Sequence, residues 1–84
     1  MKKERLLAAI YDNASVVAAM SHMGEEKGRA FLDQCADKEA SIAMGVYMGE
    51  HKDKAIRFDA IEYEEPCEEH PDQLYVYVHI IVED

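Results

Sequence analysis

The sequence predicts an α+β fold, in which two N-terminal helices pack on a C-terminal antiparallel meander of two or three strands. Three observations lead to it: apolar residues at helical spacing early in the chain, strict apolar alternation near its end, and a length of 84 residues. A chain this short buries only about 60–65% of the surface that its unfolded form exposes. We therefore expect residues 1–84 to form a single domain with a thin core.

The first predicted helix runs from residue 3 to about residue 23, because apolar residues recur there on one helical face. They are Leu6, Ile10, Val17 and Met20. Gly24 is a natural position for this helix to end. A second helix is expected from residue 25 to about residue 36, with Glu25 and Glu26 near its positive N-terminal end. Residues 1–36 then make up the helical part.

Residues 37–50 allow two interpretations. Asp37 could cap a third helix that continues through Met48. Alternatively, residues 42–48 alternate well enough to form a strand, with Gly45 as a weak point. We favour the strand, which makes residues 37–84 mainly β, and the state of residues 40–48 stays open.

The end of the chain gives the clearest strand signal. Between residues 74 and 82 every second residue is Leu, Val or Ile, which is the period of two of a pleated strand. Residues 54–64 change phase partway, and a bulge near Ala60 would restore a single core face. Pro66 and Pro71 bracket an acidic loop, residues 64–73, that joins these two strands.

The last strand is long and apolar, and a small sheet leaves at least one edge uncovered. Such an edge invites pairing with another chain, so a structural homodimer built on the C-terminal strand edge is one functional hypothesis. A related alternative places Tyr75 and Tyr77 under the first helix and leaves the valine face to form the dimer.

The net charge of -9 lies entirely in residues 58–84, which contain nine acidic residues and no Lys or Arg. These acids are Asp59, Glu62, Glu64, Glu65, Glu68, Glu69, Asp72, Glu83 and Asp84. Phosphate binding depends on clustered Lys and Arg, so direct nucleic-acid binding is disfavoured. A negative field attracts a basic protein surface instead.

Tyrosines interleave with these acids, and Tyr is common at recognition surfaces because it combines an apolar ring with a polar hydroxyl. The predicted partner-binding residues are Asp59, Glu62, Tyr63, Glu64, Glu65, Glu68, Glu69, Tyr75, Tyr77 and His79. The leading hypothesis is a non-catalytic acidic binding module, an inhibitor that covers the basic, nucleic-acid-binding surface of a partner protein. The plain alternative is a solvating acidic surface.

Cys67 and His70 have the spacing of a metal-ligand pair, but the chain holds no second pair of the kind structural zinc needs. Neighbouring glutamates also oppose formation of the Cys67 thiolate, the reactive form. We therefore expect no metal, no cofactor and no enzymatic activity. A metal-binding or small catalytic domain using these two residues is the third hypothesis.

Two cysteines, Cys35 and Cys67, are too few for a disulfide-dependent secreted domain, so we expect two thiols in a cytoplasmic protein and leave their bridging open. The longest apolar runs fall far short of the roughly 20 residues that span a bilayer, so no membrane partner is expected.

Overall fold

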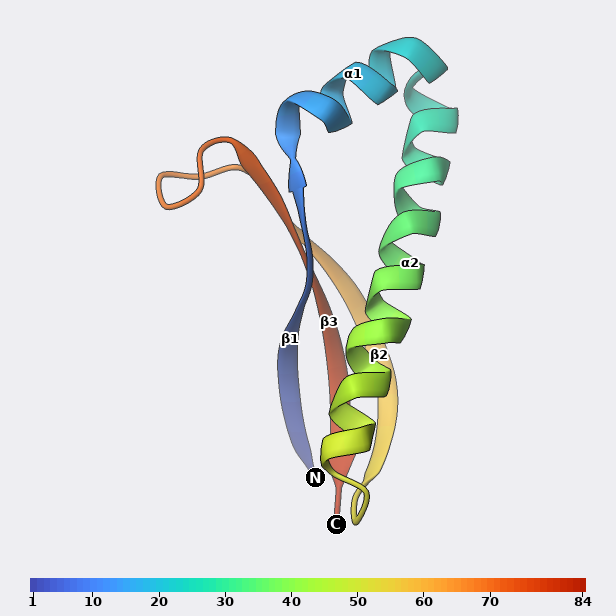
Figure 1. The fold of residues 1–84 in the computed structure, drawn as a ribbon, viewed down its shortest axis with the longest axis vertical. Coiled ribbons are helices and arrows are strands. Elements are labelled where there is room, and N and C mark those ends of the chain that lie inside the picture. The colour runs from blue at the N-terminus through green and yellow to red at the C-terminus, as the bar shows by residue number, and fades with distance from the viewer.

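The computed structural model describes residues 1–84 and begins with a strand rather than a helix (Figure 1). In chain order the elements are β1 (Lys2–Asp12), α1 (Asn13–Met23), α2 (Glu25–Glu50), β2 (Ala55–Glu64) and β3 (Gln73–Glu83). The fold is therefore α+β, but the prediction of two N-terminal helices followed by a meander is wrong. Its dimensions, 45 × 28 × 18 Å, are those of an elongated, flat molecule.

The three strands form one antiparallel sheet in the order β1-β3-β2. The last strand lies in the centre, with β1 and β2 hydrogen-bonded to its two sides. The free C-terminal strand edge predicted for self-association is thus absent, and the exposed edges belong to β1 and β2. The homodimer stays a prediction, but β3 cannot provide the free strand edge on which that prediction was based.

Strand β1 replaces the first half of the predicted N-terminal helix. Its register against β3 shifts between Leu7 and Ala9, so Ala8 is an extra residue in the ladder. This bulge changes which residues face the core. The apolar residues here are consecutive in the sequence, so the alternation typical of a strand cannot be seen. Leu and Ala also favour helices locally, and pairing with β3 overrides that preference.

The helices break where expected but continue further. Gly24 has a φ of 89°, a conformation that suits glycine, and it separates α1 from α2. Helix α2 then extends through residue 50, so the predicted end near Ala36 and the predicted strand at 42–48 are wrong. The alternative is correct that residues 37–48 are helical, but they continue α2 and do not form a third helix capped by Asp37. Ala36 and Ala40 are buried, and the small side chain of Ala40 packs closely with β3.

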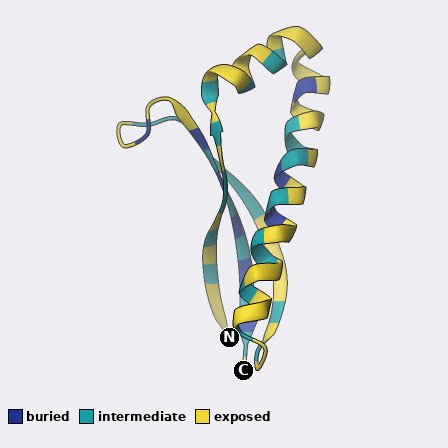
Figure 2. Ribbon diagram, in the orientation of Figure 1, coloured by how far each residue is buried: buried dark blue, intermediate teal, exposed yellow.

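The core lies between α2 and the central strand (Figure 2). The alternating apolar residues of β3 face this side and are all buried: Leu74, Val76, Val78, Ile80 and Val82. The alternative with the tyrosines of β3 under a helix is therefore wrong. Only nine residues of 84 are buried, which confirms the expected thin core.

Strand β2 and the connection after it agree with the sequence prediction. The register of β2 shifts between Phe58 and Ala60, which confirms the bulge and makes Asp59 the extra residue. Residues 65–72, the β2–β3 loop, project from the body of the molecule (Figure 1). None of the helices combines the length and the apolar character that crossing a bilayer requires.

Candidate functional site

The face of the sheet that points away from α2, here called the open face, carries half of the predicted binding residues. Tyr75, Tyr77 and His79 alternate with the buried residues of β3 and are partly exposed. In the register of the sheet, Glu64 lies opposite Tyr75 and Glu62 lies opposite Tyr77. Because directly opposed residues share a face, these five predicted residues lie together.

Arg5, from β1, occupies the middle of the open face. Its Nε lies 3.0 Å from Oε1 of Glu62, and one Nη lies 2.7 Å from Oε2 of Glu64. Its guanidinium carbon also lies 3.5 Å from the centre of the Tyr77 ring, a close cation–π contact. Sequence reasoning missed Arg5 because it placed this residue on a helix; in a strand, its alternation with Leu6 would have indicated the open face.

The carboxylates of the open face are hydrogen-bonded acceptors rather than free charges. The Arg5 hydrogen bond holds the pKa of Glu62 below its usual range, helped by His79, whose Nε2 lies 2.7 Å from Oε1 of the same carboxylate. The pKa of Glu64 is also lowered, first by hydrogen bonding to His70 and then by Arg5. The pKa of Arg5 is correspondingly raised by these carboxylates. Arg5 therefore offsets part of the negative charge of these two carboxylates from within the protein.

Tyr63 and Asp59 do not join this face. The Tyr63 hydroxyl donates a 2.6 Å hydrogen bond to Oδ1 of Asp33 on α2, so its side chain links β2 to the helix. Burial raises the pKa of Tyr63, and the hydrogen bond to Asp33 adds to this shift. Asp59 is exposed at the bulge of β2.

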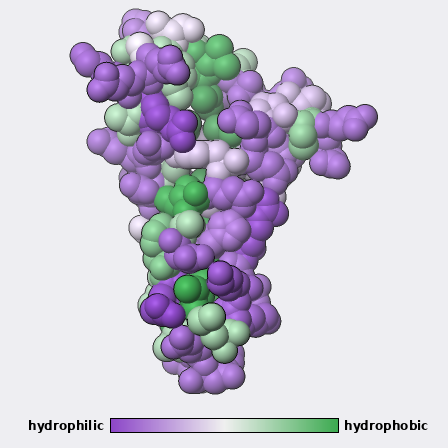
Figure 3. Space-filling model, turned by 180° about the vertical axis from the view of Figure 1, so that it is seen from behind, coloured by the Kyte–Doolittle hydropathy of each residue, from purple (hydrophilic) through white to green (hydrophobic).

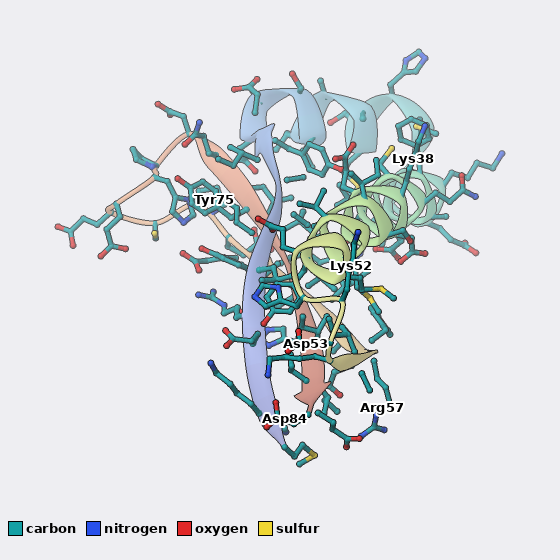
Figure 4. The ribbon with its side chains drawn as sticks, turned by 60° about the horizontal axis from the view of Figure 1, so that its bottom comes forward. Lys38, Lys52, Asp53, Arg57, Tyr75 and Asp84 are labelled. Atoms are coloured by element: carbon teal, nitrogen blue, oxygen red, sulfur yellow. The ribbon has the colours of Figure 1, made fainter.

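At the other end of the sheet, basic residues neutralise the last acids of the chain. Arg57 Nη2 lies 3.2 Å from Oε1 of Glu83, and Lys54 pairs with Asp84. Figure 4 shows Arg57 and Asp84 at this end and Tyr75 at the opposite end. Sequence counting placed all net charge after residue 57, but four of those nine acids have Lys or Arg partners in space.

Five of the nine acids remain without an ion-pair partner, and four of these lie in the β2–β3 loop. The four are Glu65, Glu68, Glu69 and Asp72, and all are exposed. Seen from behind, the protruding loop is mainly hydrophilic (Figure 3). The unbalanced negative charge of this half of the chain therefore gathers on the loop rather than on the open face.

A second cluster, at the base of the same loop, contains groups that could bind a metal ion. The potential ligand atoms of Glu64, Cys67 and His70 all lie within 4.8 Å of one another. Cys67 Sγ also lies 3.4 Å from Oε2 of Glu69. Both Cys67 and Cys35 are free thiols. The spacing of Cys67 and His70 in the sequence had suggested such a pair. Glu64 comes close to them because β2 ends at this residue.

An apolar cavity of about 260 Å³ lies where β1, α1 and α2 meet, and none of the predicted binding residues lines it. Ile10, Val16, Met20 and Phe31 contribute to its wall. The Tyr11 hydroxyl in this region is buried without a hydrogen-bond partner, and burial raises its pKa. Sequence reasoning missed the cavity because it depends on β1 meeting α1 at Asp12.

Comparison with known proteins identifies no relative, since no protein-family model, no curated protein and no solved structure matches the chain.

Proposed function

We propose that this chain is a non-catalytic binding module that docks its β2–β3 loop on a basic surface of a partner protein. The observation that carries the proposal is the concentration of four exposed, unpaired carboxylates in one projecting loop. A cluster of one sign attracts an oppositely charged surface over a distance and speeds encounter. The loop also projects from the body of the molecule, so a partner can reach it without contacting the helices or strands.

The loop is a better candidate than the acid-and-tyrosine face expected from sequence. A partner cation that approached Glu62 or Glu64 would have to compete with Arg5, which already donates to both. Glu65 and the other loop acids have no such internal competitor. Tyr75, on the open face at the base of the loop, adds an aromatic ring beside the loop acids. This ring is stacked on His70.

A nucleic-acid-handling protein is the partner class whose chemistry fits best. Its phosphate-binding surface presents clustered Lys and Arg, and closely spaced carboxylates can occupy the positions of phosphate charges. The module would then act as an inhibitor by covering that surface. Its own exposed negative charge opposes direct binding to nucleic acid for the same electrostatic reason.

A pair of variants with equal net charge tests this proposal. The loop variant carries Glu65→Gln, Glu68→Gln, Glu69→Gln and Asp72→Asn. The control variant carries Glu26→Gln, Glu39→Gln, Glu50→Gln and Asp53→Asn. It also removes three Glu and one Asp, but from positions outside the loop that have no Lys or Arg partner. Immobilised wild-type protein and both variants are exposed to nuclease-treated extract of the source organism at low salt with a chelator present.

We expect wild type and the control variant to retain the same nucleic-acid-handling protein, and the loop variant to lose it. The purified partner should bind wild type with an affinity that falls steeply as salt rises, and added nucleic acid should compete. Equal retention by both variants, retention of no protein, or binding insensitive to salt would reject the proposal.

A further inference from the structure

We propose that Glu64, Cys67 and His70 form a zinc-binding site at the base of the β2–β3 loop. The site goes beyond the partner binding proposed above and does not depend on it. The three residues supply a carboxylate, a thiol and an imidazole, and their ligand atoms lie within 4.8 Å of one another. Glu69 offers a fourth oxygen, because its Oε2 lies 3.4 Å from Cys67 Sγ.

The backbone holds two of these residues in position before any ion binds. The N–H of Cys67 donates to the carbonyl of His70 at 3.3 Å, and the N–H of His70 donates to the carbonyl of Cys67 at 3.2 Å. This reciprocal pair closes a tight turn and sets the two side chains at neighbouring positions. Glu64 is the last residue of β2, so the third ligand comes from the rigid sheet.

His70 is oriented as metal-binding histidines usually are. Its ring is fixed by stacking on Tyr75, with centroids 3.9 Å apart and planes at 9°. Its Nδ1–H donates to the carbonyl oxygen of Gln73 at 2.8 Å, and its Nε2–H donates to Oε1 of Glu64 at 2.7 Å until a metal ion displaces that proton. A hydrogen bond from the other ring nitrogen fixes the tautomer in this way in many metal sites.

Burial of His70 holds a metal-ligating ring in a fixed place at the base of the loop. It is the one buried polar or charged side chain of the whole chain, 5% exposed, although it belongs to a loop whose acids are exposed. Burying a polar ring carries a cost unless its nitrogens find partners. Both ring nitrogens have such partners, Gln73 and Glu64, and Zn²⁺ would replace the Glu64 contact of Nε2.

The donor set selects zinc among common cations. Calcium and magnesium take oxygen ligands, whereas thiolate and imidazole favour borderline-soft ions such as Zn²⁺. Around a tetrahedral zinc, ligand atoms are about 3.3–3.8 Å apart, so Cys67 must approach and the 2.7 Å contact between Glu64 and His70 must open. Binding releases the Cys67 thiol proton and any proton on His70 Nε2 to solvent.

Cobalt titration tests the site directly, because Co²⁺ occupies zinc sites and a bound thiolate gives a charge-transfer band. We expect wild type to develop this band and saturate at one equivalent, and Zn²⁺ to remove it. Cys67→Ser should lose the band, whereas Cys35→Ser, which removes the other thiol, should keep it. Absence of a band in wild type, or a band lost in Cys35→Ser and kept in Cys67→Ser, would overturn the site.

His70→Gln removes a buried ring and can unfold the loop, so a second measurement uses the unaltered chain. One equivalent of Zn²⁺ should slow alkylation of Cys67 at least tenfold and leave alkylation of Cys35 changed by less than twofold, as followed by peptide mass mapping. Unchanged alkylation of Cys67, or equal protection of both thiols, would contradict a zinc site at Cys67. Neither measurement involves a partner protein, so its failure leaves the proposed function standing.

Discussion

The two faces of the sheet stabilise the protein by different means. On the side of α2, the alternating residues of β3 are buried, and three of them pack with the small helix residue Ala40. On the open face, Arg5 joins Glu62 and Glu64 over the ring of Tyr77, and all of these groups keep contact with water. Apolar burial on the first face therefore supplies most of the stability, and the exposed ion pairs of the open face contribute little.

This difference explains where the net charge can act. Opposite charges on the open face partly cancel at a distance, whereas the β2–β3 loop has no Lys or Arg. Sequence position alone assigned the whole negative field to residues 58–84. The fold divides that region into a partly neutralised sheet and a loop that keeps its charge.

The largest effect that should separate the two faces comes from adjacent isoleucines of β3. Ile80 is fully buried under α2, and Ile81 is partly exposed on the opposite face. Ile80→Ala should lower the free energy of unfolding by about 2–5 kcal/mol, because it removes apolar burial and leaves a cavity. Ile81→Ala should cost roughly 1 kcal/mol or less. Urea denaturation measures both, and equal losses would mean that the faces do not differ in this way.

A smaller effect should come from the hydrogen bond between Tyr63 and Asp33 on the helix-covered side. Tyr63→Phe removes a 2.6 Å bond and should cost about 1 kcal/mol. Tyr77→Phe on the open face removes a hydroxyl without a hydrogen-bond partner in the protein and should change stability little.

The same bond gives a pH dependence of known sign. Hydrogen bonding by Tyr63 lowers the pKa of Asp33 in the folded protein from its ordinary 3.8. The stability from this shift is present above the unfolded pKa and is lost as pH falls through the folded pKa. The difference between wild type and Tyr63→Phe should therefore shrink as the pH falls below about 4. A difference that grows in acid would contradict the assignment.

The smallest effect, and the most sensitive to salt, should come from the charges of the open face. Arg5→Gln should lower the melting temperature by less than Tyr63→Phe does, because exposed ion pairs contribute little. Lys3→Gln, which makes the same charge change on the same strand without losing an ion pair, should have a still smaller effect. The Arg5 effect should fade at about 1 M salt, where the Debye length is about 3 Å. Persistence at high salt would show that Arg5 acts through packing on Tyr77.

The sequence was sufficient for the elements whose pattern is local. Strand β3 has an unbroken period of two, and the bulge of β2 at Asp59 followed from its phase change. Gly24 marked the break between the helices. These signals depend on a few neighbouring residues and needed no knowledge of the partner elements.

The remaining errors have a common cause, because they lie where distant contacts decide the structure. Leu6 to Ile10 form a continuous apolar run of mainly helix-favouring residues, and only pairing with β3 makes them a strand. Ile42 and Val46 favour a strand locally, yet they belong to α2 and lie more than half exposed in a groove beside β1. Arg5 escaped the candidate site for the same reason, since its position opposite His79 exists only in the paired sheet.

NMR relaxation caused by cationic and anionic paramagnetic cosolutes maps the electrostatic potential near the surface, and shows whether the β2–β3 loop is more negative than the open face. Amides of the β2–β3 loop, near Glu65, Glu68, Glu69 and Asp72, should show the stronger negative potential. Amides of the open face, near Arg5, Tyr77 and His79, should be close to neutral. An open face as negative as the loop would contradict the account.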